Sequence, residues 1–148
     1  MTTLTAASPG HRYYRWIVTA GLALYWLVML VATHVPDIPS DFDPGIGDKL
    51  EHKIAYALLG FGLGIVWHAW NCQVPWRTAA MLFGVAALYG GFDELTQPLF
   101  GRECDLRDWF ADLQGAATGL LAALVCVWSW NRWMRKATLD RRPEDRRE

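Results

Sequence analysis

Side chains that could do chemistry gather at three places in a largely apolar chain. Lys49, His52 and Tyr56 are spaced at i, i+3 and i+7, which places them on one face of a helix. Asp93 and Glu94 lie near the end of another apolar run, and a third group surrounds the beginning of the last one. Ionisable groups beside membrane-length apolar runs indicate a functional site. The candidate site residues are Lys49, His52, Tyr56, Asp93, Glu94, Gln97, Arg102, Asp105, Asp108 and Asp112.

Two kinds of chemistry suit these residues. His52 and Glu94 could act as general acid and base, which would make the protein a membrane enzyme. Lys49 and Arg102, mixed with acids and Gln97, suit binding of a lipid or glycan headgroup without transforming it, and the mixed charge favours this second interpretation. A metal site has weak support, because the group holds one histidine and no ligand pair such as HExxH. We therefore expect no metal and no cofactor.

The apolar runs predict the elements that position these residues. The chain has 148 residues, of which 53% are hydrophobic, and its apolar runs are hydrophobic all round rather than amphipathic. Each run has about the 17–25 residues that cross a bilayer as a helix. We predict an all-α fold, a four-helix transmembrane bundle spanning residues 1–136, followed by a charged disordered tail, 137–148. The predicted spans are 16–33, 49–70, 78–97 and 108–133.

The distribution of charge predicts the orientation in the membrane. Arg12 and Arg15 precede the first span, Arg77 lies between the second and third, and basic residues crowd the C-terminus, whereas the segment 34–48 is acidic. Because basic loops stay in the cytoplasm, both termini should be cytoplasmic. The three polar groups should then meet at the outer membrane face. The net charge of −1 gives no indication of a nucleic-acid partner.

Stripes of small residues lead up to each polar group. Gly60 and Gly64 continue the face of Lys49, and Gly115 and Gly119 share the face of Asp108 and Asp112. Such stripes let membrane helices approach closely, so we expect the polar residues to point into the bundle. The stripes would equally serve a homo-oligomer or a structural role beside another membrane protein. The third stripe is Ala80, Gly84, Ala87 and Gly91, leading to Glu94.

Two blocks of the sequence resemble the VanZ-like membrane proteins. They are DKLEHKIAYALLG, residues 48–60, and FDELTQPLFGRECDLRDWFADLQGAATG, residues 92–119. The family pattern has Asp-Lys-x-x-His-x-x-x-Tyr opening one helix and Glu-x-x-Gln ending the next. An Arg and a helix-opening Asp follow, with a Gly-rich continuation. One departure is Asp112, where the family often has Asn. The matching residues are Lys49, His52, Tyr56, Glu94, Gln97, Arg102, Asp108, Gly115 and Gly119.

This resemblance implies a multi-pass protein of the bacterial cytoplasmic membrane with a role in the cell envelope. The family is named for a protein linked to low-level resistance to teicoplanin, a glycopeptide antibiotic. The resemblance supplies no reaction. The function that we expect is binding of an envelope lipid or glycan headgroup. This binding could be linked to glycopeptide resistance. A membrane enzyme and a structural partner of another membrane protein are the alternatives.

Overall fold

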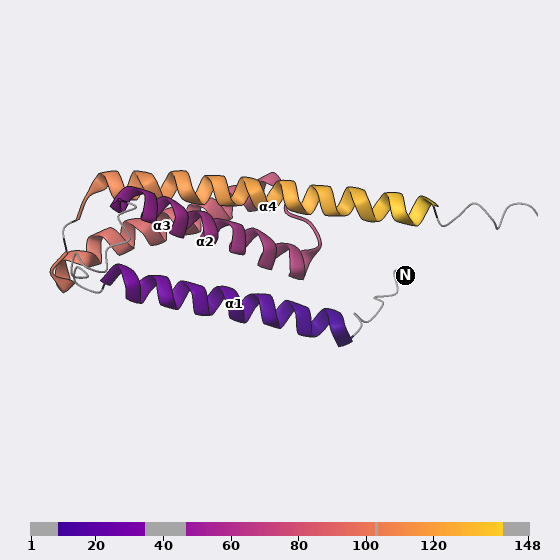
Figure 1. Ribbon diagram of the computed structural model, residues 1–148, viewed down its shortest axis with the longest axis horizontal. Helices are drawn as coiled ribbons and strands as arrows, with labels where there is room; N and C mark the ends of the chain where they lie inside the picture. Colours follow the sequence, from indigo (N-terminus) through magenta and orange to yellow (C-terminus); the bar gives the residue numbers. More distant parts are fainter. Residues whose placement is uncertain (1–8, 35–46, 103, 141–148) are drawn as a thin grey trace, which may run out of the picture.

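The computed structural model describes residues 9–34, 47–102 and 104–140, and these are almost entirely helical. Four α-helices lie side by side along the molecule (Figure 1), and none of the described residues forms a strand. The all-α prediction is therefore confirmed. The elements are α1 (Pro9–His34), α2 (Asp48–Asn71), α3 (Trp76–Thr96), the 3-10 helix η2 (Gln97–Phe100) and α4 (Leu106–Asp140).

The connections bring distant parts of the sequence to two ends of the bundle. One end holds the end of α1, the beginnings of α2 and α4, and η2 (left in Figure 1); we call it the polar end. The opposite end holds the beginning of α1, the turn between α2 and α3, and the last part of α4. Left-handed backbone ends two of the helical segments, at Cys72 (φ 60°) and Gly101 (φ 81°).

Three helices are long and apolar enough to cross a membrane, namely Gly10–His34, Lys49–Asn71 and Leu106–Thr138. Large apolar side chains cover the outside of the bundle. Leu24 is 63% exposed, Leu88 78% and Leu121 62%, although a water-soluble protein of this size would bury many such residues. The length and composition of these helices therefore fit a multi-pass membrane protein.

Helices α2 and α4 pack closely through their small residues. A Cβ atom added to Gly60 would lie 2.5 Å from the carbonyl oxygen of Ala116, and one added to Gly64 would lie 2.6 Å from the Cβ of Ala123. Added Cβ atoms on Gly115 and Gly119 would meet backbone carbonyl oxygens of α2. The predicted stripes on these two helices are therefore confirmed, and they turn the adjoining polar residues toward each other.

The small-residue stripe predicted on α3 is wrong in its first half only. Ala87 and Gly91, in its second half, face Trp109 of α4, whose ring N–H donates to the Ala87 carbonyl over 3.0 Å. In the first half, Ala80 is exposed, and a Cβ added to Gly84 would meet nothing within 4 Å. The physical reason is that this part of α3 is apolar on all sides, so its sequence pattern selects no face.

Gly90 also faces the bundle. A Cβ atom added there would lie 3.1 Å from Oδ2 of Asp112 and 3.2 Å from a ring carbon of Tyr56. The buried residues of α3 are Leu82, Ala86, Gly90, Asp93 and Glu94.

The predicted domain boundary at residue 136 falls inside a helix. Helix α4 continues to Asp140, so residues 137–140 of the expected disordered tail are helical. Residues 141–148, the rest of that tail, lie outside the described residues, as do 35–46 of the expected acidic loop.

Candidate functional site

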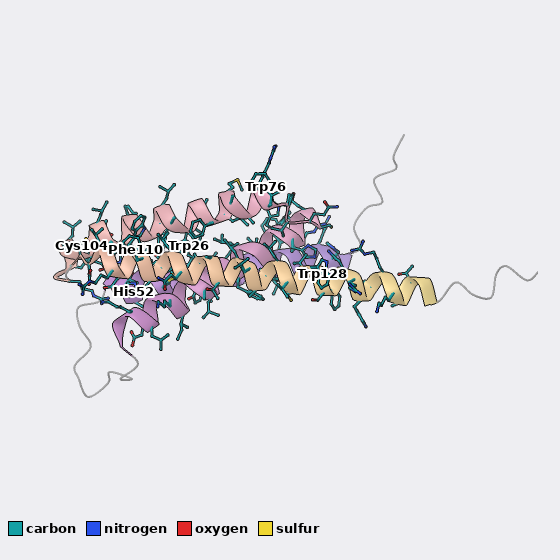
Figure 2. All side chains as sticks on the ribbon, turned by 90° about the horizontal axis from the view of Figure 1, so that it is seen from above. Trp26, His52, Trp76, Cys104, Phe110 and Trp128 are labelled. Atoms are coloured by element: carbon teal, nitrogen blue, oxygen red, sulfur yellow. The ribbon has the colours of Figure 1, made fainter. Side chains whose placement is uncertain are left out.

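All ten candidate residues lie at the polar end, where their hydrogen bonds and ion pairs fall into two adjoining clusters. Asp93 belongs to one cluster and Glu94 to the other, because the side chains of consecutive residues of an α-helix point about 100° apart. Asp93 of one cluster lies close enough to His52 and Asp112 of the other to interact with them electrostatically. His52 lies at the same end as Cys104, whereas Trp76 and Trp128 lie toward the other end (Figure 2). The α4-side cluster is Lys49, His52, Tyr56, Glu94, Asp105, Asp108 and Asp112. The α1-side cluster is Thr33, His34, Asp93, Gln97 and Arg102.

A histidine–carboxylate contact lies at the centre of the α4-side cluster. Nδ1 of His52 is 2.9 Å from Oδ1 of Asp112, and both side chains are buried. An ionised Asp112 can only accept a hydrogen bond, and the ring then donates from Nδ1. Asp112 is the residue at which the chain departs from the VanZ-like pattern. Its additional charge therefore faces a histidine, while the contacts of Lys49 are with other acids.

Lys49 lies at the rim of the α4-side cluster. Its Nζ atom is 3.2 Å from Oδ1 of Asp108 and 3.5 Å from Oδ2 of Asp105, and about half of its side chain is exposed. The backbone N–H of Arg107 donates to Asp105 over 2.8 Å. That hydrogen bond, together with the charge of Lys49, lowers the pKa of Asp105 below its ordinary value. Asp105 at the rim is thus ionised at neutral pH.

Below the rim, three polar atoms are buried without a hydrogen-bond partner among the described residues. Glu94 accepts a hydrogen bond at Oε2 from the backbone N–H of Asp105 over 3.1 Å, but its Oε1 accepts none. Oδ2 of Asp112 and the hydroxyl of Tyr56 are in the same situation. Glu94 is 3% exposed, Tyr56 1% and Asp112 0%. Burial of an unsatisfied polar group costs roughly 1–3 kcal/mol, so these atoms point to a ligand that would satisfy them.

The α1-side cluster attaches the first helix to the third. Oδ1 of Asp93 accepts a hydrogen bond from the Thr33 hydroxyl over 2.8 Å and lies 3.6 Å from Nδ1 of His34. Gln97 reaches the other oxygen of Asp93 over 3.5 Å, and Arg102 donates to the backbone carbonyl of Thr33 over 3.2 Å. Both oxygens of Asp93 thus have protein partners, which favours a structural role.

Sequence reasoning missed Thr33 and His34. The sequence places His34 just after the first predicted span, whereas His34 ends α1 and contacts Thr96 through Nε2 over 2.9 Å. The predicted topology could have revealed this contact. The chain crosses the membrane twice between the end of the first span and the end of the third, so these two ends lie at the same membrane face. A histidine at that depth was therefore a candidate for contact with Asp93.

The comparisons with known proteins give no family for the chain. No protein-family model, curated protein or solved structure matches it. The resemblance to VanZ-like proteins thus rests on the two sequence blocks, and the function has to be argued from the geometry of the polar end.

Proposed function

We propose that this chain is a VanZ-like protein that spans the bacterial cytoplasmic membrane four times. In this proposal α3 is the fourth span. Its 21 residues extend about 31 Å, which matches a hydrocarbon core of roughly 30 Å. Leu88 and Phe92 expose apolar side chains on its outer surface, while Asp93 and Glu94 are buried inside the bundle. The two acids lower the mean hydropathy of α3 without meeting lipid.

Arginine–tryptophan pairs at the end opposite the polar end support cytoplasmic termini. An arginine guanidinium lies over a tryptophan ring at 5.4–5.6 Å from the ring centroid in three places. Tryptophan is enriched at membrane interfaces, and basic residues are enriched on the cytoplasmic side. The polar end would then face outward. The pairs are Arg15 with Trp70, Arg77 with Trp76, and Arg132 with Trp128.

At the outer face, the α4-side cluster would bind a hydroxyl-rich headgroup of an envelope lipid or glycan. The observation that carries this proposal is the set of buried, unpartnered oxygens of Glu94, Asp112 and Tyr56 below the charged rim. Sugar hydroxyls can donate to carboxylates and accept from a phenol. Lys49 already contacts two acids, so the cluster suits a headgroup that donates hydrogen bonds better than a simple anion.

An apolar groove between α1 and α2 supports a lipid-linked ligand over a free sugar. It is lined by Leu22 and Tyr25 of α1 and by Leu58 and Gly62 of α2, among others, and its lining is almost purely apolar. Leu58 follows Tyr56 along α2, so the groove lies farther into the membrane than the α4-side cluster. A headgroup at the polar end would leave its acyl chain at the depth of this groove.

Mass spectrometry of lipids that copurify with the full-length protein tests this proposal. We expect a glycolipid that is enriched over the bulk membrane and is lost in Tyr56→Phe and Glu94→Gln. Tyr56→Phe removes only the unpartnered hydroxyl, so it should fold. Glu51→Gln, an exposed acid of α2, is the matched control and should retain the lipid. Equal lipid content in wild type and both cluster variants would rule out headgroup binding at this cluster.

The His52–Asp112 contact favours an enzyme as the second candidate. A carboxylate that orients an imidazole ring is the arrangement of a general base. Acid–base chemistry at Glu94 predicts complete loss of function in Glu94→Gln, whereas hydrogen bonding at Glu94 predicts partial function. The test expresses each variant at the normal protein level in a deletion strain and measures sensitivity to teicoplanin and other envelope-active compounds. Complete or partial loss of function then separates acid–base chemistry from hydrogen bonding at Glu94.

A further inference from the structure

Three helices each contribute one metal-ligating side chain to the same point of the α4-side cluster. His52 of α2, Glu94 of α3 and Asp108 of α4 each offer a ligand atom, and these atoms all lie within 4.8 Å of one another. All three side chains are buried, with exposures of 7%, 3% and 7%. Ligands about 2.0–2.2 Å from a metal ion lie roughly 3–3.5 Å apart, so a small inward movement would close this set around one ion.

We propose that His52, Glu94 and Asp108 bind a divalent transition-metal ion. The sequence alone supports a metal weakly, because the three ligands come from separate spans and have no motif spacing. The nitrogen–oxygen donor set suits Zn²⁺ or Mn²⁺ better than Mg²⁺ or Ca²⁺, which take oxygen ligands. Three protein ligands also leave a coordination position open. Metal binding does not require that a headgroup binds.

The contact between His52 and Asp112 gives the site the second shell of a metal centre. A ring that donates from Nδ1 to Asp112 carries its lone pair on Nε2, so Nε2 is the nitrogen that would bind a metal. Metal-binding histidines commonly donate their other ring N–H to a carboxylate, which fixes the orientation of the ring. Asp112 is fully buried and contacts no lysine or arginine among the described ion pairs, so positioning His52 accounts for its charge.

An unsatisfied oxygen independently points to a ligand at the same place. Oε1 of Glu94 is buried and accepts no hydrogen bond from the described residues, while Oε2 is fixed by the backbone N–H of Asp105. A cation would satisfy Oε1. It would also add positive charge beside the acids of the α4-side cluster, of which Lys49 contacts Asp105 and Asp108.

Metal binding by the full-length protein in detergent or nanodiscs tests the proposal directly. After chelation and removal of the chelator, titration with Zn²⁺ or Mn²⁺ should show one ion per chain. His52→Ala and Glu94→Gln should weaken binding by more than the roughly 10–100-fold expected for loss of a second-shell partner, as in Asp112→Ala. His11→Ala and Glu51→Gln, which alter exposed residues, are the matched controls. Unchanged affinity in both ligand variants would overturn the site.

A measurement on the wild type keeps the test decisive if the ligand variants do not fold. Co²⁺ bound by one histidine and two carboxylates should give visible d–d absorption bands that saturate at one equivalent and disappear on addition of Zn²⁺. Absence of saturable bands and of stoichiometric Zn²⁺ binding would rule out the site without any substitution. Neither experiment contains a headgroup lipid, so its result is independent of headgroup binding.

Discussion

Two consecutive acids of α3 have different surroundings, and this difference organises the polar end. Asp93 receives hydrogen bonds at both oxygens, from Thr33 and Gln97. Glu94 receives one from the backbone of Asp105 and keeps its second oxygen unsatisfied. A carboxylate with both oxygens satisfied by protein stabilises the fold, whereas one with an unsatisfied buried oxygen is suited to a ligand. We therefore assign attachment of α1 to Asp93 and ligand binding to Glu94.

At the residue scale, Thr33→Val tests the assignment of Asp93. Valine has nearly the shape of threonine but cannot donate to Asp93. The free energy of unfolding should fall by about 0.6 kcal/mol, the mean for interhelical hydrogen bonds in a membrane protein, and by at most about 1.7 kcal/mol, the largest value. Denaturant titration in mixed micelles measures it. Thr118→Val is the control, because that hydroxyl bonds only within its own helix, to Gln114. Equal stability of both variants would show that the Thr33–Asp93 bond contributes nothing.

Helical spacing explains which site residues the sequence could reveal. His52 and Tyr56 on one face, and Asp108 and Asp112 on another, follow from the period of the α-helix, and the structure buries all four. The separate partners of Asp93 and Glu94 could not be deduced, because they depend on how far α3 is rotated about its axis. His34 was missed because no residue at helical spacing marks it.

At the scale of elements, small residues specified the packed helix face fully on α2 and α4 and only in part on α3. The stripes of α2 and α4 each continue a polar face, and both were predicted correctly. The stripe of α3 leads to Glu94, and only its part near that residue, Ala87 and Gly91, faces α4. Because α2 and α4 use their stripes on each other, these stripes are not available for a homo-oligomer, and oligomerisation stays an untested prediction.

Replacement of glycines by leucine tests the α2–α4 contact. In Gly115→Leu and Gly119→Leu the new side chain would collide with backbone carbonyl groups of α2, which cannot move aside as a flexible side chain can. We expect a loss of at least about 1–3 kcal/mol in stability and a lower folded yield in membranes. Gly84→Leu is the matched control, since a Cβ there meets nothing within 4 Å. Normal yield and melting temperature in all three would show that α2 and α4 do not pack closely.

At the scale of the whole molecule, the two ends of the bundle have opposite character. The polar end contains the buried acids, whereas the opposite end contains the arginine–tryptophan pairs. Basic residues are retained on the cytoplasmic side, so this asymmetry predicts that the polar end faces outward. The orientation decides which molecules could reach the α4-side cluster, since an outward-facing cluster meets envelope components and an inward-facing one meets cytoplasmic solutes.

Two native cysteines report this orientation without added reporters. Cys104 lies in the connection between η2 and α4 at the polar end, Cys72 lies at the end of α2 at the opposite end, and both are exposed. A membrane-impermeant maleimide applied to intact bacterial cells should label Cys104, and Cys72 should react only after the cells are opened. Cys126 is exposed within the apolar surface of α4, where lipid would shield its thiol from a water-soluble reagent.

Single-cysteine variants assign each label to its residue. Cys104 alone, after Cys72→Ser and Cys126→Ser, should react in intact cells, and Cys72 alone should not. Labelling of Cys72 but not Cys104 would place the polar end in the cytoplasm. That result would exclude an envelope headgroup from the outer face as the ligand. It would leave the proposed metal site intact, because His52, Glu94 and Asp108 are brought together by the packing of α2, α3 and α4 in either orientation.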